Sequence, residues 1–369
     1  MQFEASQDQL AKALALVSRV IQPQNNLAVL SGVQLDARDN VLSITGTDLF
    51  TMLVSHIPVH VDEPGTIVVP AALTAELIHK LPTATLTVQA NYDSGKAIVR
   101  YGKNQATLHG FAQERLPDFP DIEGPLRTIA IAAGTFPRLA RQLLFACAKD
   151  ETRPILRGVS LKLGSGRLVL AATDGSRLSQ TWIPVPEYLD DPLECVLPAK
   201  AVAEAARLNT AADGELTVGS NMMRFRSSEG ELVARLLDGQ YPDYQRVIPQ
   251  EYVAQGRINV NDFRGALERA NLIAAKDRAA SVRIRHTVGE LQISASAQEY
   301  GQTLESVECD SHGQDLDLLF NPIYLLEALR SLEGDEALLE FSGVQSPLRI
   351  REVEHSQYSH VVLPLRQLV

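Results

Sequence analysis

The chain has 369 residues, of which 45% are apolar and 21% charged, and its formal net charge is −11. This length exceeds what one hydrophobic core usually serves, and no apolar run reaches the roughly 18 to 20 residues that a membrane-spanning helix needs. Cys147, Cys195 and Cys309 lie far apart and outside any Cys-x-x-Cys pair, which argues against a disulfide framework and a zinc site. The acidic balance at first argues against nucleic acid as a partner.

Three segments, spaced about a third of the chain apart, have apolar residues at the three-to-four spacing of an amphipathic helix. They are residues 6–21 with Leu10, Leu14, Val17 and Ile21; residues 135–149 with Phe136, Leu139, Leu143 and Cys147; and residues 261–276 with Phe263, Leu267, Ala270 and Ile273. Each predicts a helix that packs its apolar face on a sheet.

Strands and a second helix follow each of these segments in the same order. An alternating strand enters a polar turn in "VLSITGTDL", "RLVLAATDGSRL" and "ELQISASAQEYG". A further strand then ends at Val69-Pro70, Leu197-Pro198 or Phe320-Asn321, where proline or asparagine suits the start of a helix, and paired strands come next. The turns "RLPDF" and "QYPDY", with Pro117 and Pro242, close the first two units.

This period predicts three domains, at residues 1–126, 127–253 and 254–369, each made of two βαβββ halves. Strands that cluster in runs joined by short turns suit antiparallel sheets, so the predicted fold class is α+β.

The order of "LSITGTDL", "ATDGSRL", "LLDGQYPDYQRVIP", "FNPIYLLEAL" and "VVLPLR" resembles the bacterial sliding clamps, the beta subunits of DNA polymerase III, over essentially the full length. The resemblance implies a head-to-tail homodimer that forms a closed ring of six domains around duplex DNA, without regard to its sequence. It also implies recruitment of the replicative polymerase alpha subunit, the clamp loader and other proteins with a clamp-binding motif.

The resemblance places a peptide-binding groove between the second and third domains. Its residues are Leu156, Thr173, Gly175, Ser176, Arg177, Leu178, Pro242, Arg246, Val247, Tyr324, Val344, Ser346, Val362, Leu363, Pro364, Leu365 and Arg366. Such a set makes an apolar pocket, rimmed by hydroxyl and guanidinium donors, for an extended peptide. Leu363 and Leu365 are expected to turn toward Leu178 and Val247. Without the resemblance, Asp174-Gly175 would be read as an ordinary turn.

The distribution of charge answers the objection to DNA. The six helical segments carry 12 basic and 6 acidic residues, a net +6, so the rest of the chain carries −17. Helices that line a hole would attract phosphates while the acidic outside repels other DNA. The candidate DNA-binding residues are Lys12, Arg19, Lys80, Arg138, Arg141, Lys149, Arg153, Lys200 and Arg207. Ordinary solvated helix faces are an equally good explanation of any single one. The loop at Gln24 and Asn25 lacks the family's basic residue.

By family position, one dimer surface has Lys103, Gln105 and Leu108, and the other has Leu272, Ile273, Glu299 and Glu305. Ala106 stands where the family often has a bulky aromatic residue, which predicts a weaker dimer. Residues 367–369 extend slightly beyond the family's usual end.

The competing interpretation is a metal-free hydrolase or isomerase with a site between domains. "DSGKAI" lacks the upstream glycine and the following Ser or Thr of a phosphate-binding loop, and Asp48 and Asp174 would lie in different domains. Three equivalent domains offer no unique polar cleft, so we expect no catalytic residue, metal or cofactor. The N-terminus has no signal-peptide pattern, which predicts a cytoplasmic protein without membrane contact.

Overall fold

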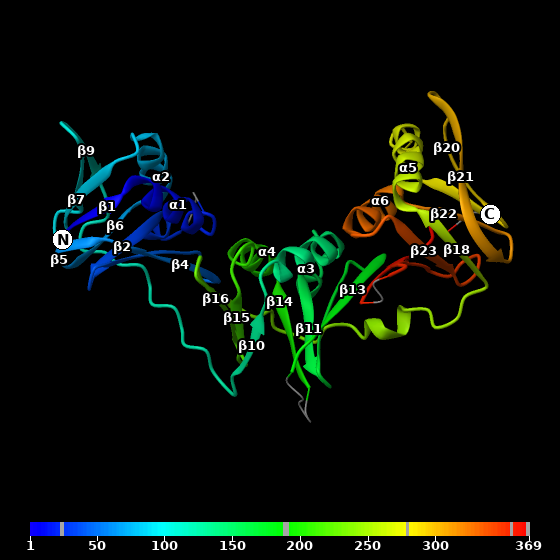
Figure 1. Ribbon diagram of the computed structural model, residues 1–369, viewed down its shortest axis with the longest axis horizontal. Helices are drawn as coiled ribbons and strands as arrows, with labels where there is room; N and C mark the ends of the chain where they lie inside the picture. Colours follow the sequence, from blue (N-terminus) through cyan, green and yellow to red (C-terminus); the bar gives the residue numbers. More distant parts are fainter. Residues whose placement is uncertain (23–25, 187–191, 278–279, 355–356, 367–369) are drawn as a thin grey trace. The chain divides into compact units, whose positions relative to one another are not determined.

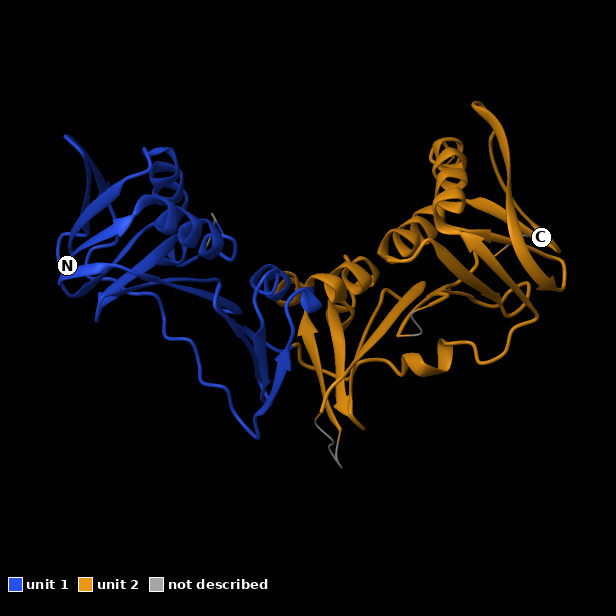
Figure 2. Ribbon diagram, viewed as in Figure 1, with its two compact units in different colours: residues 1–136, 204–236 blue, residues 137–203, 237–369 orange. Residues whose placement is uncertain are grey.

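The computed structural model describes residues 1–22, 26–186, 192–277, 280–354 and 357–366. It contains two compact units, drawn in blue and orange in Figure 2: unit 1 consists of residues 1–136 and 204–236, and unit 2 of residues 137–203 and 237–369. The three sequence domains with boundaries near 126 and 253 stay a prediction. Gln24, Asn25 and residues 367–369, which entered the sequence analysis, lie outside the described residues.

The first third of the chain contains the strand–helix–three-strand order twice (Figure 1). The first copy is β1 (Gln2–Ser6), α1 (Gln7–Val17), β2 (Gly32–Arg38), β3 (Val41–Thr47) and β4 (Thr51–Pro58), with the short helix η1 (Ala28–Ser31) after α1. The second is β6 (Gly65–Pro70), α2 (Ala71–Lys80), β7 (Thr85–Asn91), β8 (Lys96–Tyr101) and β9 (Asn104–His109), and β5 (His60–Glu63) lies between the copies. "DSGKAI" forms the β7–β8 turn and the start of β8.

The same order recurs in the next two thirds. The central elements are β10 (Arg127–Ile131), α3 (Thr135–Leu143), η2 (Leu144–Ala146), η3 (Pro154–Arg157), β11 (Gly158–Gly164), β12 (Arg167–Thr173), β13 (Arg177–Pro184), β14 (Leu193–Pro198), α4 (Ala199–Leu208), β15 (Gly214–Val218), β16 (Met222–Ser227), β17 (Gly230–Arg235) and η4 (Tyr244–Val247). The last are β18 (Ala254–Asn259), α5 (Val260–Ala274), β19 (Val282–Thr287), β20 (Glu290–Ala297), β21 (Gly301–Gly313), β22 (Leu316–Phe320), α6 (Pro322–Ser331), β23 (Glu336–Phe341), β24 (Leu348–Glu352) and β25 (Tyr358–Val362). The predicted six βαβββ halves are confirmed.

Unit 1 has two antiparallel sheets. One has the order β5-β1-β7-β8-β9, and the other has the order β10-β15-β16-β17-β4-β3-β2-β6. β17 pairs with β4 from Glu231↔Val54 to Ala234↔Thr51, which joins the central third of the sequence to the first. Alternating side chains bury one face of these strands, and Leu42 and Ile44 of β3 are fully buried.

Unit 2 has one long sheet, in the order β14-β11-β12-β13-β25-β24-β23-β18-β21-β20-β19-β22. Its centre is the pairing of β13 with the C-terminal strand β25, from Arg177↔Val362 to Thr181↔Tyr358. This pairing places the turn before β13 beside the end of β25, so residues almost 190 positions apart contribute to one surface. Leu363 N donates to Ser176 O (3.0 Å) just beyond the last pair.

The helices keep their predicted apolar faces but end earlier than predicted. α1 ends at Val17, and the chain turns at Ser18, so Val20 is buried in place of the predicted Ile21. α3 ends at Leu143, and Cys147 follows a separate short helix. Asn321 caps α6 as expected, because its side chain accepts from Ile323 N (3.0 Å). Pro70 precedes α2 without a side-chain cap.

Within the described residues, no helix is long and apolar enough to cross a membrane. In the same part of the chain, no group of three or more His, Cys, Asp and Glu side chains is placed to hold a metal ion.

Candidate functional site

An apolar cavity of about 220 Å³ lies in unit 2 at the end of β25. We call it the groove cavity. Its apolar lining is Leu156, Leu178, Pro242, Val247, Val361 and Leu363, and its rim is Arg153, Thr173, Gly175, Arg177, Asp243 and Tyr244. The structure thus brings together four segments of the sequence: η3, the β12–β13 turn, residues 242–247 with the short helix η4, and the end of β25.

The β12–β13 turn is built by its own polar side chains. Thr173 Oγ1 donates to Arg177 O (2.6 Å), and Asp174 Oδ1 accepts from Ser176 N (2.9 Å) and Arg177 N (3.2 Å). Gly175 has a φ of +93°, a backbone conformation in which any residue with a Cβ would be strained, so the turn favours glycine.

The equivalent turn between β3 and β4 has the same construction. Asp48 Oδ1 accepts from Phe50 N (3.1 Å) and Thr51 N (2.7 Å), and Thr47 Oγ1 donates to Thr51 O (3.0 Å). The structure therefore assigns Asp48 and Asp174 to turns, which is the structural interpretation favoured from the sequence.

Arg177 is the most heavily bonded residue described at the groove cavity, and its side chain is only 4% exposed. Its guanidinium donates to Asp174 Oδ2 (2.9 Å), to Glu327 Oε2 of α6 and to Phe145 O. It also lies 4.3 Å from the centroid of the Tyr324 ring. A buried cation needs such partners because desolvation of an unpaired charge is costly. Arg177 is thus held in one position in the wall of the groove cavity, because its hydrogen bonds go to other residues of the protein.

The geometry predicts that Glu327 supports peptide binding without lining the groove cavity. In Glu327→Gln, Arg177 loses one of its two carboxylates, and a charged hydrogen bond is worth roughly 1.5 to 3 kcal/mol. Only part of this energy is transmitted to the wall of the groove cavity, so we expect a 3- to 10-fold lower affinity for a labelled partner peptide in fluorescence anisotropy. Glu333→Gln, which breaks the more exposed pair with Arg141, is the control. Equal affinities in both variants would contradict a supporting role.

Several residues assigned to the groove from the resemblance lie elsewhere. Val362 is fully buried in the core of the C-terminal repeat, because successive strand residues face opposite sides. By the same alternation Val361 faces the groove cavity with Leu363, and the sequence analysis missed it. Leu365 is not among the lining residues of this cavity: the chain leaves β25 after Val362, and Leu365 N donates to Leu319 O (2.7 Å).

The remaining predicted groove residues are outside the lining of the groove cavity. Tyr324 stacks on Arg177, and Arg246 forms an ion pair with Asp243 (2.7 Å). The predicted groove residues that do not line the groove cavity also include Ser176, Arg246, Tyr324, Val344, Ser346, Pro364 and Arg366. Val344 is 58% exposed. These residues stay candidates for contacts along a longer peptide.

Arg153, a candidate DNA-binding residue, also lines the groove cavity. Its Nη2 donates to Asp174 O (2.8 Å), and its Nη1 lies against Gly175. This contact follows from the glycine at position 175, which leaves room for the guanidinium. The local sequence gave no sign of it, because the two residues are 22 positions apart.

The candidate DNA-binding residues lie on helices or just after them, and several are already in ion pairs. The pairs are Lys12–Asp8 (2.7 Å), Lys80–Glu76 (2.6 Å), Arg19–Glu204 (3.2 Å), Arg207–Glu204 (2.7 Å) and Arg141–Glu333. Lys12 and Arg207 line one cavity of about 300 Å³ in unit 1. Lys149 and Lys200 are exposed, and Arg138 is half-buried. The pairs of Lys12, Lys80 and Arg141 are exposed on both sides and therefore weak, so these three cations can exchange a carboxylate for a phosphate. Glu204 is buried (side chain 7% exposed), so Arg19 and Arg207 are held more firmly to it.

The predicted dimer residues lie on or near two strand edges. Lys103 and Gln105 are exposed at β9, and Leu272 of α5 is 69% exposed. Leu108 differs from the expected exposed contact residue, because it is buried within its own protomer (4% exposed). Ile273 is partly buried against the core, Glu299 is exposed in the β20–β21 turn, and Glu305 pairs with Arg269 (2.6 Å).

His360 lies fully buried in β25, beside the groove-cavity wall. Its Nδ1 is 2.6 Å from Ser179 Oγ of β13. Burial, and secondly the charge of Arg177, lower the pKa of His360 to about 3. The imidazole is therefore neutral in the folded protein at any pH near 7.

This burial predicts acid destabilisation below pH 6.5. The folded pKa of His360 is below its ordinary value of 6.5, so the unfolded chain binds the proton first, and stability is lost as pH falls from 6.5 toward 3. At pH 5 the loss is about 2 kcal/mol. Urea unfolding at pH 7.5 and 5 should show a smaller pH effect in His360→Gln than in the wild type. An identical pH effect would contradict this origin.

Solved structures with the same architecture cover the whole chain. The crystal structure of a DNA polymerase sliding clamp from Bacillus subtilis matches with a TM-score of 0.94 and 30% identity, over 100% of this chain and 99% of that one. A DnaN sliding clamp from Pseudomonas aeruginosa bound to griselimycin matches with a TM-score of 0.94 and 28% identity, over 100% of both chains. The fold and its three repeats therefore define a protein of the DNA-clamp class.

Sequence comparisons identify the family within this class. Models of the N-terminal, central and C-terminal domains of the DNA polymerase III beta subunit match residues 1–121, 130–243 and 245–366. The beta sliding clamps of Bacillus subtilis and Pseudomonas putida are 30% and 31% identical, over 99% of this chain and 100% of each relative. The chain belongs to the bacterial DNA polymerase III beta subunit family, the beta sliding clamps. This family is a non-catalytic processivity factor, not an enzyme.

Proposed function

We propose that the protein works as a ring-shaped homodimer that encircles duplex DNA and holds the replicative polymerase on it. The same ring would recruit the polymerase alpha subunit, the clamp loader and other proteins with a clamp-binding motif. The observation that carries the recruiting role is the groove cavity, an apolar site with a fixed polar rim at the end of β25. Such a cavity suits the apolar anchors of an extended peptide.

The dimer would form through two strand edges. Within the described residues, β9 pairs only with β8, and residues 301–308 of β21 pair only with β20. Open edges of this kind are templates for pairing with another chain. We infer that β9 of one protomer adds to β21 of its partner, with Gln105, Leu272 and Leu304 at the contact. Leu304 is 70% exposed, and burial of such side chains would favour association.

DNA would be held by phosphate contacts from the basic residues of the helices. Such contacts carry no sequence information, so the ring can slide. Because several of these cations are already paired with carboxylates, each contact is expected to be weak. A weak and distributed hold suits a protein that must move along the duplex. We place the protein in the cytoplasm, where the bacterial chromosome is copied.

The experiment that tests this proposal is retention on DNA. A closed ring stays on a circular duplex and slides off the ends of a linear one. A protein that binds DNA without encircling it would be retained equally on both.

A further inference from the structure

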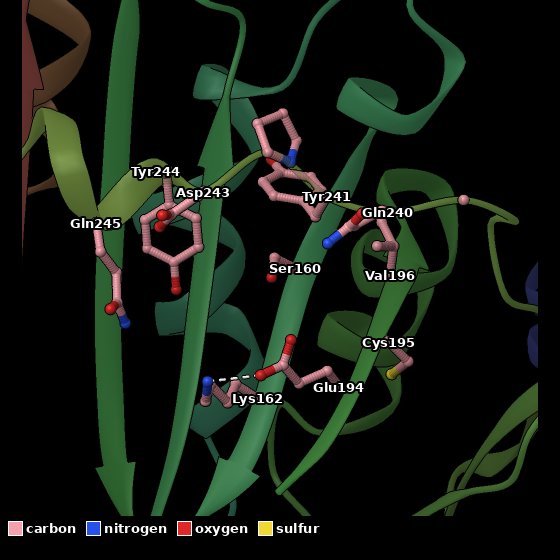
Figure 3. A pocket seen from close by; sticks show the side chains of 12 residues that line it. Ser160, Lys162, Glu194, Cys195, Val196, Gln240, Tyr241, Asp243, Tyr244 and Gln245 are labelled. Atoms are coloured by element: carbon pink, nitrogen blue, oxygen red, sulfur yellow. Dashed lines mark ion pairs between the residues drawn. The ribbon is translucent and has the colours of Figure 1, made fainter.

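A second cavity of about 570 Å³ lies in unit 2 against residues 239–245, a segment that we call the connector (Figure 3). We call it the connector cavity. Its floor is Ser160 and Lys162 of β11 with Glu194, Cys195 and Val196 of β14, and its remaining lining is the connector, residues 239–245. Figure 3 shows Lys162 and Glu194 joined across its floor.

One side of the connector cavity has an open strand edge. Among the described residues, no strand pairs with the outer edge of β14. Leu237 N donates to Val196 O (2.9 Å), so the main-chain groups of Val196 point away from β11. Because hydrogen-bonding directions alternate along an antiparallel strand, those of Glu194 point the same way. The edge next to Glu194 is thus able to pair with an extended chain.

The connector cavity and the groove cavity have a common wall. Pro242, Asp243 and Tyr244 line both. The wall is fixed: Tyr244 is 9% exposed and packs edge-on against Tyr241, whose hydroxyl accepts from Thr173 N (3.1 Å). A chain that occupies the groove cavity therefore reaches the connector cavity by crossing this one wall.

The floor of the connector cavity suits a polar segment. Lys162 and Glu194 form an ion pair (2.5 Å) whose side chains are 41% and 64% exposed. An exposed pair of this kind contributes little stability, so both charges are available to side chains or main-chain amides of a bound segment. Tyr241 and Tyr244 add apolar ring surface to the same space.

We propose that the connector cavity binds the residues that flank the apolar anchors in an extended partner peptide, by pairing with the edge of β14 and contacting Lys162 and Glu194. This proposal rests on the proposed peptide groove and extends it. Partner affinity would then depend on a polar flanking segment as well as on the apolar anchors.

The test compares a short labelled peptide, with one glutamine and two apolar anchors, with versions extended by five polar residues at either end. On the wild-type protein, extension at one end should tighten binding 5-fold or more in fluorescence anisotropy. Ser160→Trp, which fills the connector cavity, should remove this gain and leave the short peptide unaffected. Glu194→Lys, at an exposed position that folding tolerates, should reduce the gain. Val288→Trp, in an exposed turn, is the matched control.

Two results would overturn the proposal: extended peptides that bind no tighter than the short one, or a gain that survives in both variants. Failure of the short peptide to bind the wild-type protein would be distinguishable, because it would overturn the proposed groove itself, and the extension with it.

Discussion

Aspartate at both Val247 and Leu363 should lower the affinity for a partner peptide at least 100-fold. The two side chains are 46% and 39% exposed and line the groove cavity, so the protein tolerates polar groups there while unbound. An apolar anchor would have to desolvate two carboxylates, which costs several kcal/mol, and 100-fold in affinity corresponds to only about 2.7 kcal/mol. Fluorescence anisotropy with a labelled peptide measures the loss.

Val288→Asp is the matched control, because Val288 is 67% exposed in the β19–β20 turn and outside both cavities. It should bind the peptide like the wild type. The double variant should keep its dimeric mass, since neither substitution touches β9 or β21. Unaltered peptide affinity in the double variant would mean that the groove lies elsewhere.

Thr107→Pro should convert the protein from dimer to monomer at micromolar concentration. Tyr101 and Asn104 flank the two-residue turn between β8 and β9 and form the hydrogen-bonded pair. The alternation along β9 then points the N–H groups of Gln105 and Thr107 outward. Proline removes the outward donor at position 107 and leaves the ladder with β8 intact.

Sedimentation should give a mass near 40.3 kDa for the proline variant and near twice that for the wild type. Thr107→Val keeps the donor and is the control for a change of side chain. A dimeric Thr107→Pro protein would argue against pairing through β9. A monomeric wild-type protein would argue against the ring in solution. Ala106, which predicts a weaker dimer contact, would then be the residue to which we attribute the loss.

The architecture was predictable because it repeats. Three amphipathic helices and three strand-to-helix junctions at near-equal spacing predict six similar halves, and the structure has them. The helix ends were not predictable to the residue. Ile21 and Cys147 continue the helical spacing, yet Ser18 closes α1 early and α3 is followed by a separate short helix. Local turns that form after a helix override its periodicity.

Part of the lining of the groove cavity was predictable. Thr173, Gly175 and Leu178, which the resemblance assigns to a peptide-binding groove, line the groove cavity, and their role in peptide binding stays a prediction. The partners of Arg177 were not predictable, because Glu327 lies 150 positions away and no local pattern pairs the two. Alternation along β25 would have found Val361 and excluded Val362 once the strand was placed. A family resemblance identifies which strand contributes to a site, but the strand register is needed to decide which of its residues face the site.

The encircling ring is tested most directly by loading the protein onto a closed circular duplex with its clamp loader and then cutting the circle. We expect the wild-type protein to elute with the closed circle and to be lost after linearisation, whatever the DNA sequence. Thr107→Pro should fail to remain on either form. Equal retention of the wild-type protein on the circular and the linear duplex would contradict encirclement.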